Sequence, residues 1–494
     1  MWTSSRRFRY RRALQGGLFM PKVLDYRAWR GRALVALATA AMISVGLPSA
    51  AADSDSSVEV VFSTLPTGVP VPSLGALQAM GSGWKAGLPV RETAAGKLPR
   101  EAIAPARSGL PKASTPSFLS DEMTGRVPFA ATYPEPPRTM TKDECKKGLQ
   151  GGRLFAVKSR YAMCTGTQFV QTWMQRGRPV GQSSFTLWVI DTVPKKNDRT
   201  VQIRYLFTDF KKASTTRTGG LKIDTDGDVT TWPKQAARKY GGQVPPVQSF
   251  DALKAKPEYI HTMLVEPGQG TGKDDIVQMA YEPFVKLTFP SPYTSPNTGR
   301  VSVGFLTGRW DTASYLFNKT GGGKPKKKGG ATLPVVPTLP YSSKTGAPER
   351  AVAQHLRDAH TKPGGTKPVN ARKAVPGFDL KHTLHRLQHD DARVQANRRA
   401  AIATCVKHWG PNYATSVPGV PRECDEYPFA STYEGAAQSK YDGKKPKDNF
   451  SARPLPRSDN GAGGNILKIF MDRNRILDGF SSGDDVDAYI VSIS

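Results

Sequence analysis

The chain has few cysteines, a shortage of acidic residues and no apolar run long enough for a good membrane span. Only four of its 494 residues are cysteine. No CxxC pair occurs, which argues against zinc ribbons and thioredoxin-like chemistry. Its 41 Asp plus Glu stand against 70 Lys plus Arg, so the formal net charge is +29. Aromatic residues make up 9% of the chain, enough for packed cores, so a wholly disordered protein is excluded.

An apolar run near the N-terminus has the pattern of an export signal. A basic flank precedes residues 33–47, and small residues at Ala50 and Ala52 form an A-x-A cleavage pattern. The run is too short for a good membrane span. We therefore predict a signal peptide over residues 1–52, no transmembrane anchor after its cleavage, and a secreted, extracellular protein. A buried N-terminal helix is the alternative.

The four cysteines form two pairs that are close in sequence, which suits an oxidising destination. Cys145 precedes Cys164, and Cys405 precedes Cys424. Two local disulfides, one in each folded region, are the simplest pairing. Free buried thiols are the alternative.

Composition divides the rest of the chain into four segments. Residues 53–120 are rich in Pro, Ala, Gly and Ser and predict a mostly disordered lead-in. Residues 125–318 contain alternating runs such as SFTLWVIDTV and predict a β-rich, sandwich-like domain of antiparallel strands. Residues 319–349, with glycines, prolines and a lysine run, predict an extended linker. Residues 350–494 predict a second, α+β unit.

One motif in the β-rich segment has the letters of a metal loop. DTDGD, residues 224–228, resembles a calcium loop, but its glycine falls too early and no acidic residue occupies the twelfth position. We expect a hairpin turn between two strands there.

The C-terminal unit predicts helices and strands in alternation. Residues 380–409 carry apolar side chains at helical spacing and predict one long helix. DEYPFAST and ARPLP predict two strands, GGNILKIFMDRNRIL predicts a helix, and DDVDAYIVSI predicts a closing strand.

Three histidines, His382, His385 and His389, fall on one face of the predicted long helix. A zinc site there would lack a fourth ligand and the glutamate of HExxH. A polar or DNA-facing helix surface is the favoured interpretation. A histidine general base is the minority alternative, with His408 also nearby in sequence.

Acidic and amide side chains gather around the two predicted strands and the helix after them. Asp425, Glu426, Glu434, Asp459 and Asn460 are hard oxygen ligands of the kind that Mg²⁺, Mn²⁺ and Ca²⁺ bind. An ion there would bind a phosphate oxygen, while a carboxylate takes a proton from water. An exposed acidic strand edge with a helix cap would give the same pattern. Nearby basic residues would offset repulsion from a phosphate backbone: Lys444, Lys445, Arg453 and Arg457.

Several separated motifs resemble the NucA/NucB family of secreted deoxyribonucleases. They are CDEYPFASTYEGA, then RPLPRSDNGAGG, then RILDG, in that order. Upstream, NRRAAIATC is similar to the family's helix that leads into a cysteine. The resemblance covers residues 375–494, and nothing before residue 350 resembles the family.

The resemblance implies a divalent-metal-dependent DNA endonuclease with a ββα-metal core and Mg²⁺ or Mn²⁺ as its ion. It implies Asp425 as the general base, with Glu426 orienting it or supporting the ion. It implies Glu434 as a metal ligand or as a residue that contacts a metal ligand. It also implies Asn460 as the best metal ligand, and Asp459 as a second ligand or a helix cap.

This sequence departs from the family's pattern at two places. EGA stands where the family has EGG, and the family's arginine between SDN and the glycine-rich run is missing after Asn460. Arg457 or Arg473 would have to supply that cation. The Cys405–Cys424 pairing would then pin the DE-bearing strand to the helix before it.

The sequence therefore predicts a multidomain protein with a β-rich, sandwich-like N-terminal domain and a C-terminal nuclease domain that hydrolyses extracellular DNA. A nuclease toxin delivered to competitors, with a matching immunity or inhibitor protein, is one alternative. A non-catalytic DNA-binding surface or matrix protein with a degenerate nuclease domain is another. The β-rich domain would contact cell wall, polysaccharide or DNA, or would hold the nuclease inactive.

Overall fold

The structure of the chain is a computed structural model. The predicted signal peptide, residues 1–52, and Lys444 lie outside the described residues. No helix in the described ranges has both the length and the apolar character needed to cross a membrane. The structure describes residues 58–80, 132–195, 199–234, 236–295, 300–316, 329–443, 445–480 and 487–494.

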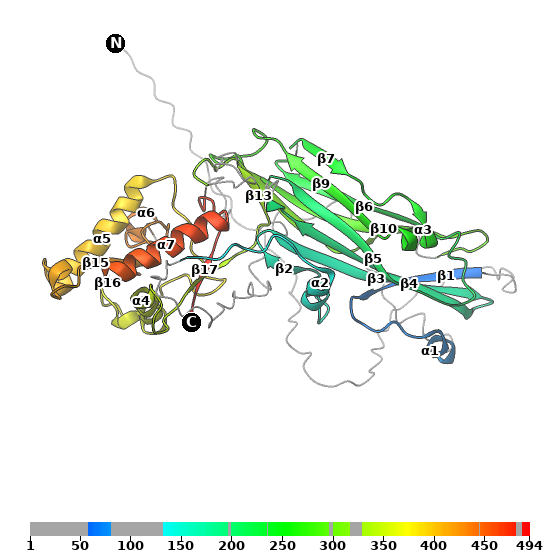
Figure 1. The fold of residues 1–494 in the computed structure, drawn as a ribbon, viewed down its shortest axis with the longest axis horizontal. Helices are drawn as coiled ribbons and strands as arrows, with labels where there is room; N and C mark the ends of the chain where they lie inside the picture. The colour runs from blue at the N-terminus through cyan, green and yellow to red at the C-terminus, as the bar shows by residue number, and fades with distance from the viewer. Residues whose placement is uncertain are drawn as a thin grey trace, which may run out of the picture. The chain divides into compact units, whose positions relative to one another are not determined.

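Two antiparallel sheets make up the β-rich part of the chain (Figure 1). The first has the order β1-β3-β4-β5-β9-β7, with β2 beside β3. Its strands are β1 (Val58–Pro66), β2 (Ala156–Ser159), β3 (Ala162–Gln175), β4 (Arg178–Thr192), β5 (Val201–Ser214), β7 (Arg238–Gly242) and β9 (Glu258–Val265). The second has the order β13-β12-β10-β6-β8, with β11 beside β10. Its strands are β6 (Lys222–Trp232), β8 (Gln248–Ser249), β10 (Val277–Thr288), β11 (Val301–Ser302), β12 (Leu306–Asp311) and β13 (Gly330–Thr332).

One apolar core takes side chains from both sheets. β4 contributes Phe185 and Leu187, and β10 contributes Met279 and Tyr281, all at alternate positions along their strands. Alternation places every second side chain on the same face of a sheet, and here those faces pack together. The β-rich prediction is confirmed. Three short helices accompany these sheets: α1 (Leu74–Ala79), α2 (Lys142–Gly148) and α3 (Phe250–Ala255).

Part of the predicted disordered lead-in is an ordered strand. β1 pairs with β3 along its whole length, from Val58↔Gln175 to Pro66↔Thr167, and Phe62 is buried in the core. The prediction of disorder for residues 53–120 is therefore wrong over Val58–Pro66. This short apolar segment was grouped with the Pro- and Gly-rich sequence that follows it. Residues 81–131 lie outside the described part.

The end of the predicted linker, residues 319–349, is also ordered. β13 pairs with β12, and β14 (Thr338–Tyr341) pairs in parallel with β17 (Ile490–Ile493) at the C-terminus. Leu339 and Tyr341 are buried. The linker prediction is wrong for these residues, and the lysine run falls within residues 317–328, which the structure leaves undescribed.

The DTDGD segment is neither a calcium loop nor a hairpin turn. β6 runs through it and pairs with β10 from Lys222↔Thr288 to Trp232↔Gln278. A Cβ at Gly227 would lie 2.1 Å from the ring of Tyr281, so close packing requires the glycine. Asp228 forms an ion pair with Arg300 at 2.7 Å.

The C-terminal part places two antiparallel strands among helices. The strands are β15 (Arg422–Tyr427) and β16 (Ser451–Pro456), with Asp425 opposite Arg453. The helices are α4 (Arg350–Thr361), α5 (Asp391–Trp409), α6 (Gln438–Tyr441) and α7 (Arg457–Arg473), with 3₁₀ turns at Pro363–Gly365 and Tyr413–Thr415. The strand–strand–helix order β15, β16, α7 agrees with the prediction.

The predicted long helix over residues 380–409 is wrong in its first third. The helix begins at Asp391, where the side chain of Asp390 accepts a hydrogen bond from the Arg393 amide at 2.8 Å. The preceding residues form isolated bridges, such as Leu384↔Tyr489, so their apolar side chains are buried without a helix.

Both predicted disulfides are present. Cys145 is bonded to Cys164, and Cys405 of α5 is bonded to Cys424 of β15. Each closes a separation of 19 residues. The second bond fixes the strand that carries the DE pair against α5.

Candidate functional site

The pair β15–β16 lies between α5 on one face and α4 with α7 on the other. Successive side chains of a strand point to opposite faces. Cys424 therefore faces α5, to which its disulfide is made, while Asp425 faces α4. On β16, Arg453 reaches Asp358 of α4 at 2.7 Å.

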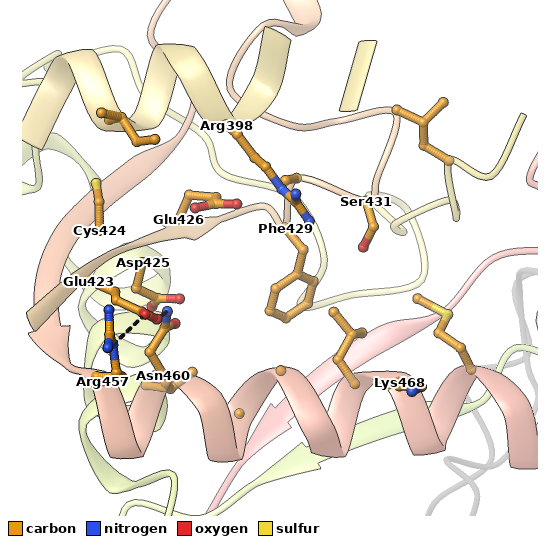
Figure 2. A pocket seen from close by; sticks show the side chains of 18 of the residues that line it. Arg398, Glu423, Cys424, Asp425, Glu426, Phe429, Ser431, Arg457, Asn460 and Lys468 are labelled. Atoms are coloured by element: carbon orange, nitrogen blue, oxygen red, sulfur yellow. Dashed lines mark hydrogen bonds and ion pairs between the residues drawn. The ribbon is translucent and has the colours of Figure 1, made fainter. Parts of the chain in front are cut away.

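A groove of about 860 Å³ opens between α5, β15 and α7 (Figure 2). Its walls carry several charged and amide side chains: Glu423, Asp425 and Glu426 from β15, Arg457, Asn460 and Lys468 from α7, and Arg398 from α5. Of the predicted site residues, Asp425, Glu426 and Asn460 line this groove.

Asp425 is held by a histidine that the sequence motifs did not reveal. Its Oδ2 lies 2.6 Å from Nδ1 of His355, and the other imidazole nitrogen lies 2.7 Å from the hydroxyl of Ser451. Asp425 is 7% exposed, His355 0% and Ser451 1%, so the carboxylate stands at the boundary between groove and interior. His355 comes from α4, and Ser451 from the first position of β16.

Glu426 is a proton-bearing carboxyl group at neutral pH. Withdrawal from solvent, together with the adjacent charge of Asp425, raises its pKa to about 8, although Arg398 acts in the opposite direction. Asp425 and Glu426 thus differ in what they offer the groove. One accepts a hydrogen bond from a buried imidazole, and the other carries a proton that it can donate.

Asn460 lies in the first turn of α7, and a hydrogen bond to Glu423 orients its side chain. Its amide nitrogen donates to Oε2 of Glu423 at 2.9 Å, and Glu423 also pairs with Arg457 at 2.8 Å. The carbonyl oxygen of Asn460 is therefore the atom left for a ligand. Of the two candidates for the missing cation, Arg457 lines the groove, whereas Arg473 pairs with Glu135.

Two cations line the groove and form no ion pair with another described residue. Arg398 extends from α5 into the groove and Lys468 lies on α7 across from it (Figure 2). Both are exposed, and neither makes a hydrogen bond or ion pair with any other residue whose position is described. Such side chains suit the negative charges of a phosphate backbone.

Four other predicted site residues are not brought to this groove. Glu434 accepts a hydrogen bond from Nδ1 of His385 at 2.7 Å and another from its amide at 2.9 Å. Asp459 accepts a hydrogen bond from the amide of Ala351 and so caps α4 rather than α7. Arg453 pairs with Asp358, and Lys445 is exposed elsewhere on the surface.

The three histidines of the zinc alternative are dispersed. His382 contacts Asp379, His385 contacts Glu434, and His389 contacts Asp274. No group of three His, Cys, Asp or Glu side chains able to hold a metal ion occurs in the ranges that the structure describes.

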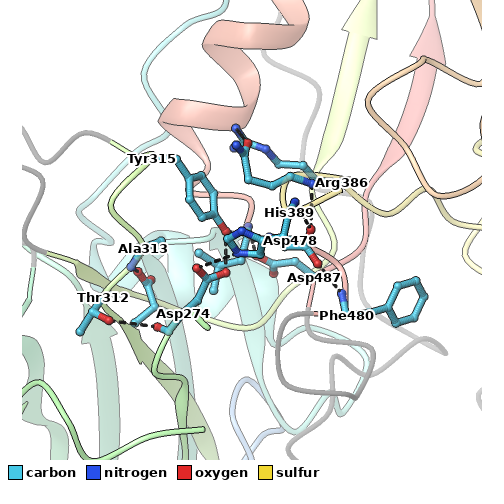
Figure 3. Close-up of polar contacts among 12 residues, drawn as sticks. Asp274, Thr312, Ala313, Tyr315, Arg386, His389, Asp478, Phe480 and Asp487 are labelled. Atoms are coloured by element: carbon cyan, nitrogen blue, oxygen red, sulfur yellow. Dashed lines mark hydrogen bonds and ion pairs between the residues drawn. The ribbon is translucent and has the colours of Figure 1, made fainter. Parts of the chain in front are cut away.

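A residue of the β-rich part also lines the groove. Tyr315 lines it, donates to Oδ2 of Asp274 at 2.6 Å and accepts a hydrogen bond from the amide of Asp478 at 2.9 Å (Figure 3). Asp478 in turn accepts from the amides of Gln388 and His389. The groove is therefore shaped jointly by both parts of the chain.

The residues that the sequence analysis missed are His355, Arg398 and Lys468. A polar residue on the buried face of an amphipathic helix was the available signal for His355, since Val352 and Leu356 on the same helix are buried. Arg398 and Lys468 gave no signal, because many basic residues occupy helices in this chain.

The C-terminal segment matches a known family. Residues 377–481 match the family model described as Deoxyribonuclease NucA/NucB. The chain carries a NucA/NucB deoxyribonuclease domain. A search of curated proteins and a search of solved structures found no match.

The NucA/NucB domain contains most of the groove. Asp425, Glu426, Asn460, Arg398 and Lys468 all fall within the matched residues, and His355 precedes them. The family indicates a deoxyribonuclease, so DNA is the implied substrate.

Proposed function

We propose that the groove is the active site of a secreted, divalent-metal-dependent endonuclease that hydrolyses phosphodiester bonds of extracellular DNA. The observation that carries the proposal is the combination in one groove of a histidine-bound carboxylate, Asp425, with two exposed cations, Arg398 and Lys468, that form no ion pair among the described residues. A carboxylate supplies proton transfer, and the cations supply contacts to phosphate.

The reaction requires two proton transfers around one phosphorus atom. The carboxylate of Asp425 takes a proton from water, the resulting hydroxide attacks phosphorus, and one P–O ester bond breaks. The departing oxygen accepts a proton from Glu426, whose raised pKa keeps it protonated at neutral pH. Arg457, which lines the groove at the start of α7, would neutralise a non-bridging phosphate oxygen.

The donor set suits a sparsely ligated ion such as Mg²⁺ or Mn²⁺. Glu423 and Asn460 line the groove with hard oxygen atoms, but no complete cage of ligands occurs among the described residues. Mg²⁺ usually keeps several waters and uses one or two carboxylates plus substrate phosphates, so few protein ligands suffice. When bound, the ion would stabilise negative charge on the phosphate. Asn460 would hold it through its carbonyl oxygen.

Replacing Lys468 by alanine tests whether this groove binds the DNA backbone. We expect the Lys468→Ala variant of the full chain to cleave supercoiled plasmid with a raised KM. One lost phosphate contact should also lower the steepness of the plot of log affinity against log salt by about 1. The measurement is cleavage rate against plasmid concentration at several salt concentrations.

Lys445→Ala is the matched control, because Lys445 is a surface lysine of the same domain that does not line the groove. It should match the wild type in KM and in salt dependence. Equal effects of the two substitutions would place DNA binding elsewhere. A folded wild-type chain that leaves plasmid intact would overturn the proposed function itself.

A further inference from the structure

We propose that His355 is a positioning residue for the nuclease reaction and that it aims the Asp425 carboxylate into the groove. The inference rests on the proposed function. His355 lies in α4, before the residues 377–481 that match the family model. The catalytic unit of this protein would then begin upstream of its NucA/NucB domain.

The direction of the hydrogen bond follows from the chemistry of the partners. An ionised carboxylate only accepts hydrogen bonds, so Nδ1 of His355 must donate to Oδ2 of Asp425 across their 2.6 Å separation. The hydroxyl of Ser451 holds the other ring nitrogen at 2.7 Å and fixes the ring plane. With Oδ2 engaged, Oδ1 is the oxygen that remains to take a proton in the groove.

The order Ser451, His355, Asp425 superficially resembles a serine hydrolase triad, but the burial is reversed. In such a triad the serine hydroxyl faces the substrate and the aspartate lies behind the histidine. Here Ser451 is 1% exposed and is not among the groove-lining residues, whereas Asp425 lines the groove. The reacting group is therefore the carboxylate, and the imidazole stands behind it.

The helix that carries His355 is fixed on three sides. Asp459 of α7 caps its N-terminus through the amide of Ala351 at 3.1 Å. A Cβ on Gly463 of α7 would approach Val352 to 3.0 Å, so the two helices are in close contact. Near the other end, Asp358 pairs with Arg453 of β16. Because these contacts constrain the helix, the buried ring of His355 is held in a fixed orientation against Asp425.

Two amide substitutions of His355 distinguish a role in positioning Asp425 from a merely structural role as a packed side chain. In His355→Asn the side-chain NH₂ lies near the place of Nδ1 and can still donate to Asp425. In His355→Gln the amide extends toward Ser451, near the place of Nε2. Both variants are neutral and polar, so a merely structural role predicts similar rates. The experiment measures kcat, KM and thermal unfolding of the full chain, with Asp425→Asn as the inactive reference.

We expect His355→Gln to lower kcat by about 100-fold with KM within a factor of two of wild type, because a misaimed base slows the proton transfer and leaves binding intact. His355→Asn should recover most of the wild-type kcat. Equal kcat values for the two folded variants, or wild-type kcat in His355→Gln, would overturn the inference. If Asp425→Asn cleaves like wild type, the proposed function fails instead, since its base is then wrong.

Discussion

Replacing Asp487 by alanine is expected to destabilise the whole protein by about 3–5 kcal/mol, because it leaves two buried guanidinium groups without their counter-ion. Asp487 is 1% exposed and pairs with Arg160 at 2.7 Å and with Arg309 at 2.6 Å. Both arginines belong to the β-rich part, while Asp487 follows the nuclease helix α7. Denaturant unfolding of the full chain measures the loss.

Glu258→Ala is the matched control, since it also removes an acidic partner of an arginine. Its pair with Arg204 is exposed to solvent, with 43% of the Glu258 side chain accessible. Exposed pairs contribute about 0–1 kcal/mol, so this variant should stay close to wild type. A small effect of Asp487→Ala, comparable to that of Glu258→Ala, would show that the buried cluster does not join the two parts.

The ionisation of Asp487 gives the same contact a pH dependence. Burial alone would raise the pKa of Asp487, but Arg160 and Arg309 outweigh burial and hold the pKa below its usual value. A folded-state pKa below the unfolded value means that the stabilisation is present at neutral pH. It is lost as the pH falls through the acidic range.

A second buried ion pair also connects the β-rich part to the C-terminal part. Arg475 holds both carboxylate oxygens of Asp311, with nitrogen–oxygen distances of 2.7 and 2.5 Å. β14, which precedes α4, also pairs with β17. An excised segment 350–494 would lose all of these partners. The NucA/NucB domain of this chain is therefore best assayed in the full protein.

Replacing Glu426 by glutamine is expected to lower kcat/KM by about 100-fold. It should also remove the fall in kcat/KM that we expect of the wild type at alkaline pH. Glu426 acts as a proton donor only while protonated, so kcat/KM of the wild type should fall as the pH rises through its pKa of about 8. Glutamine neither donates such a proton nor titrates. The measurement is the pH profile of plasmid cleavage from pH 6 to about 9, which spans this pKa.

Glu434→Gln provides the control for this profile, because Glu434 contacts His385 and does not line the groove. The variant should keep the alkaline decline of the wild type, even if its unfolding temperature changes. An unchanged decline in Glu426→Gln would mean that another group titrates, and Glu426 would not be the proton donor.

The sequence predicted the elements whose signal is local. Alternating apolar residues marked several strands of the two sheets, such as β4, and short spacing marked both cysteine pairs. The DE pair was placed on a strand, as the structure has it, and the SDN segment at the start of a helix that in the structure begins earlier, at Arg457. In each case neighbouring residues alone determine the pattern.

The sequence predictions that were wrong or incomplete concern contacts between segments that are far apart in the chain. β1 was assigned to a disordered lead-in because its partner β3 lies far along the chain. Residues 380–390 have leucines at helical spacing, yet Leu384 is buried through a bridge to Tyr489. His355 forms a hydrogen bond with Asp425, which is 70 residues away in the sequence. Glu434 forms a hydrogen bond with His385 and does not line the groove. No local pattern encodes such pairings.

Incubation of supercoiled plasmid with the full chain, disulfides intact, beside Asp425→Asn decides whether the groove is a nuclease active site. Separate reactions contain Mg²⁺, Mn²⁺ or EDTA. We predict nicked and then linear DNA with wild type in Mg²⁺ or Mn²⁺, and intact plasmid with EDTA and with the folded Asp425→Asn variant. Intact plasmid with folded wild type under both ions, or equal cleavage by Asp425→Asn, would contradict the account.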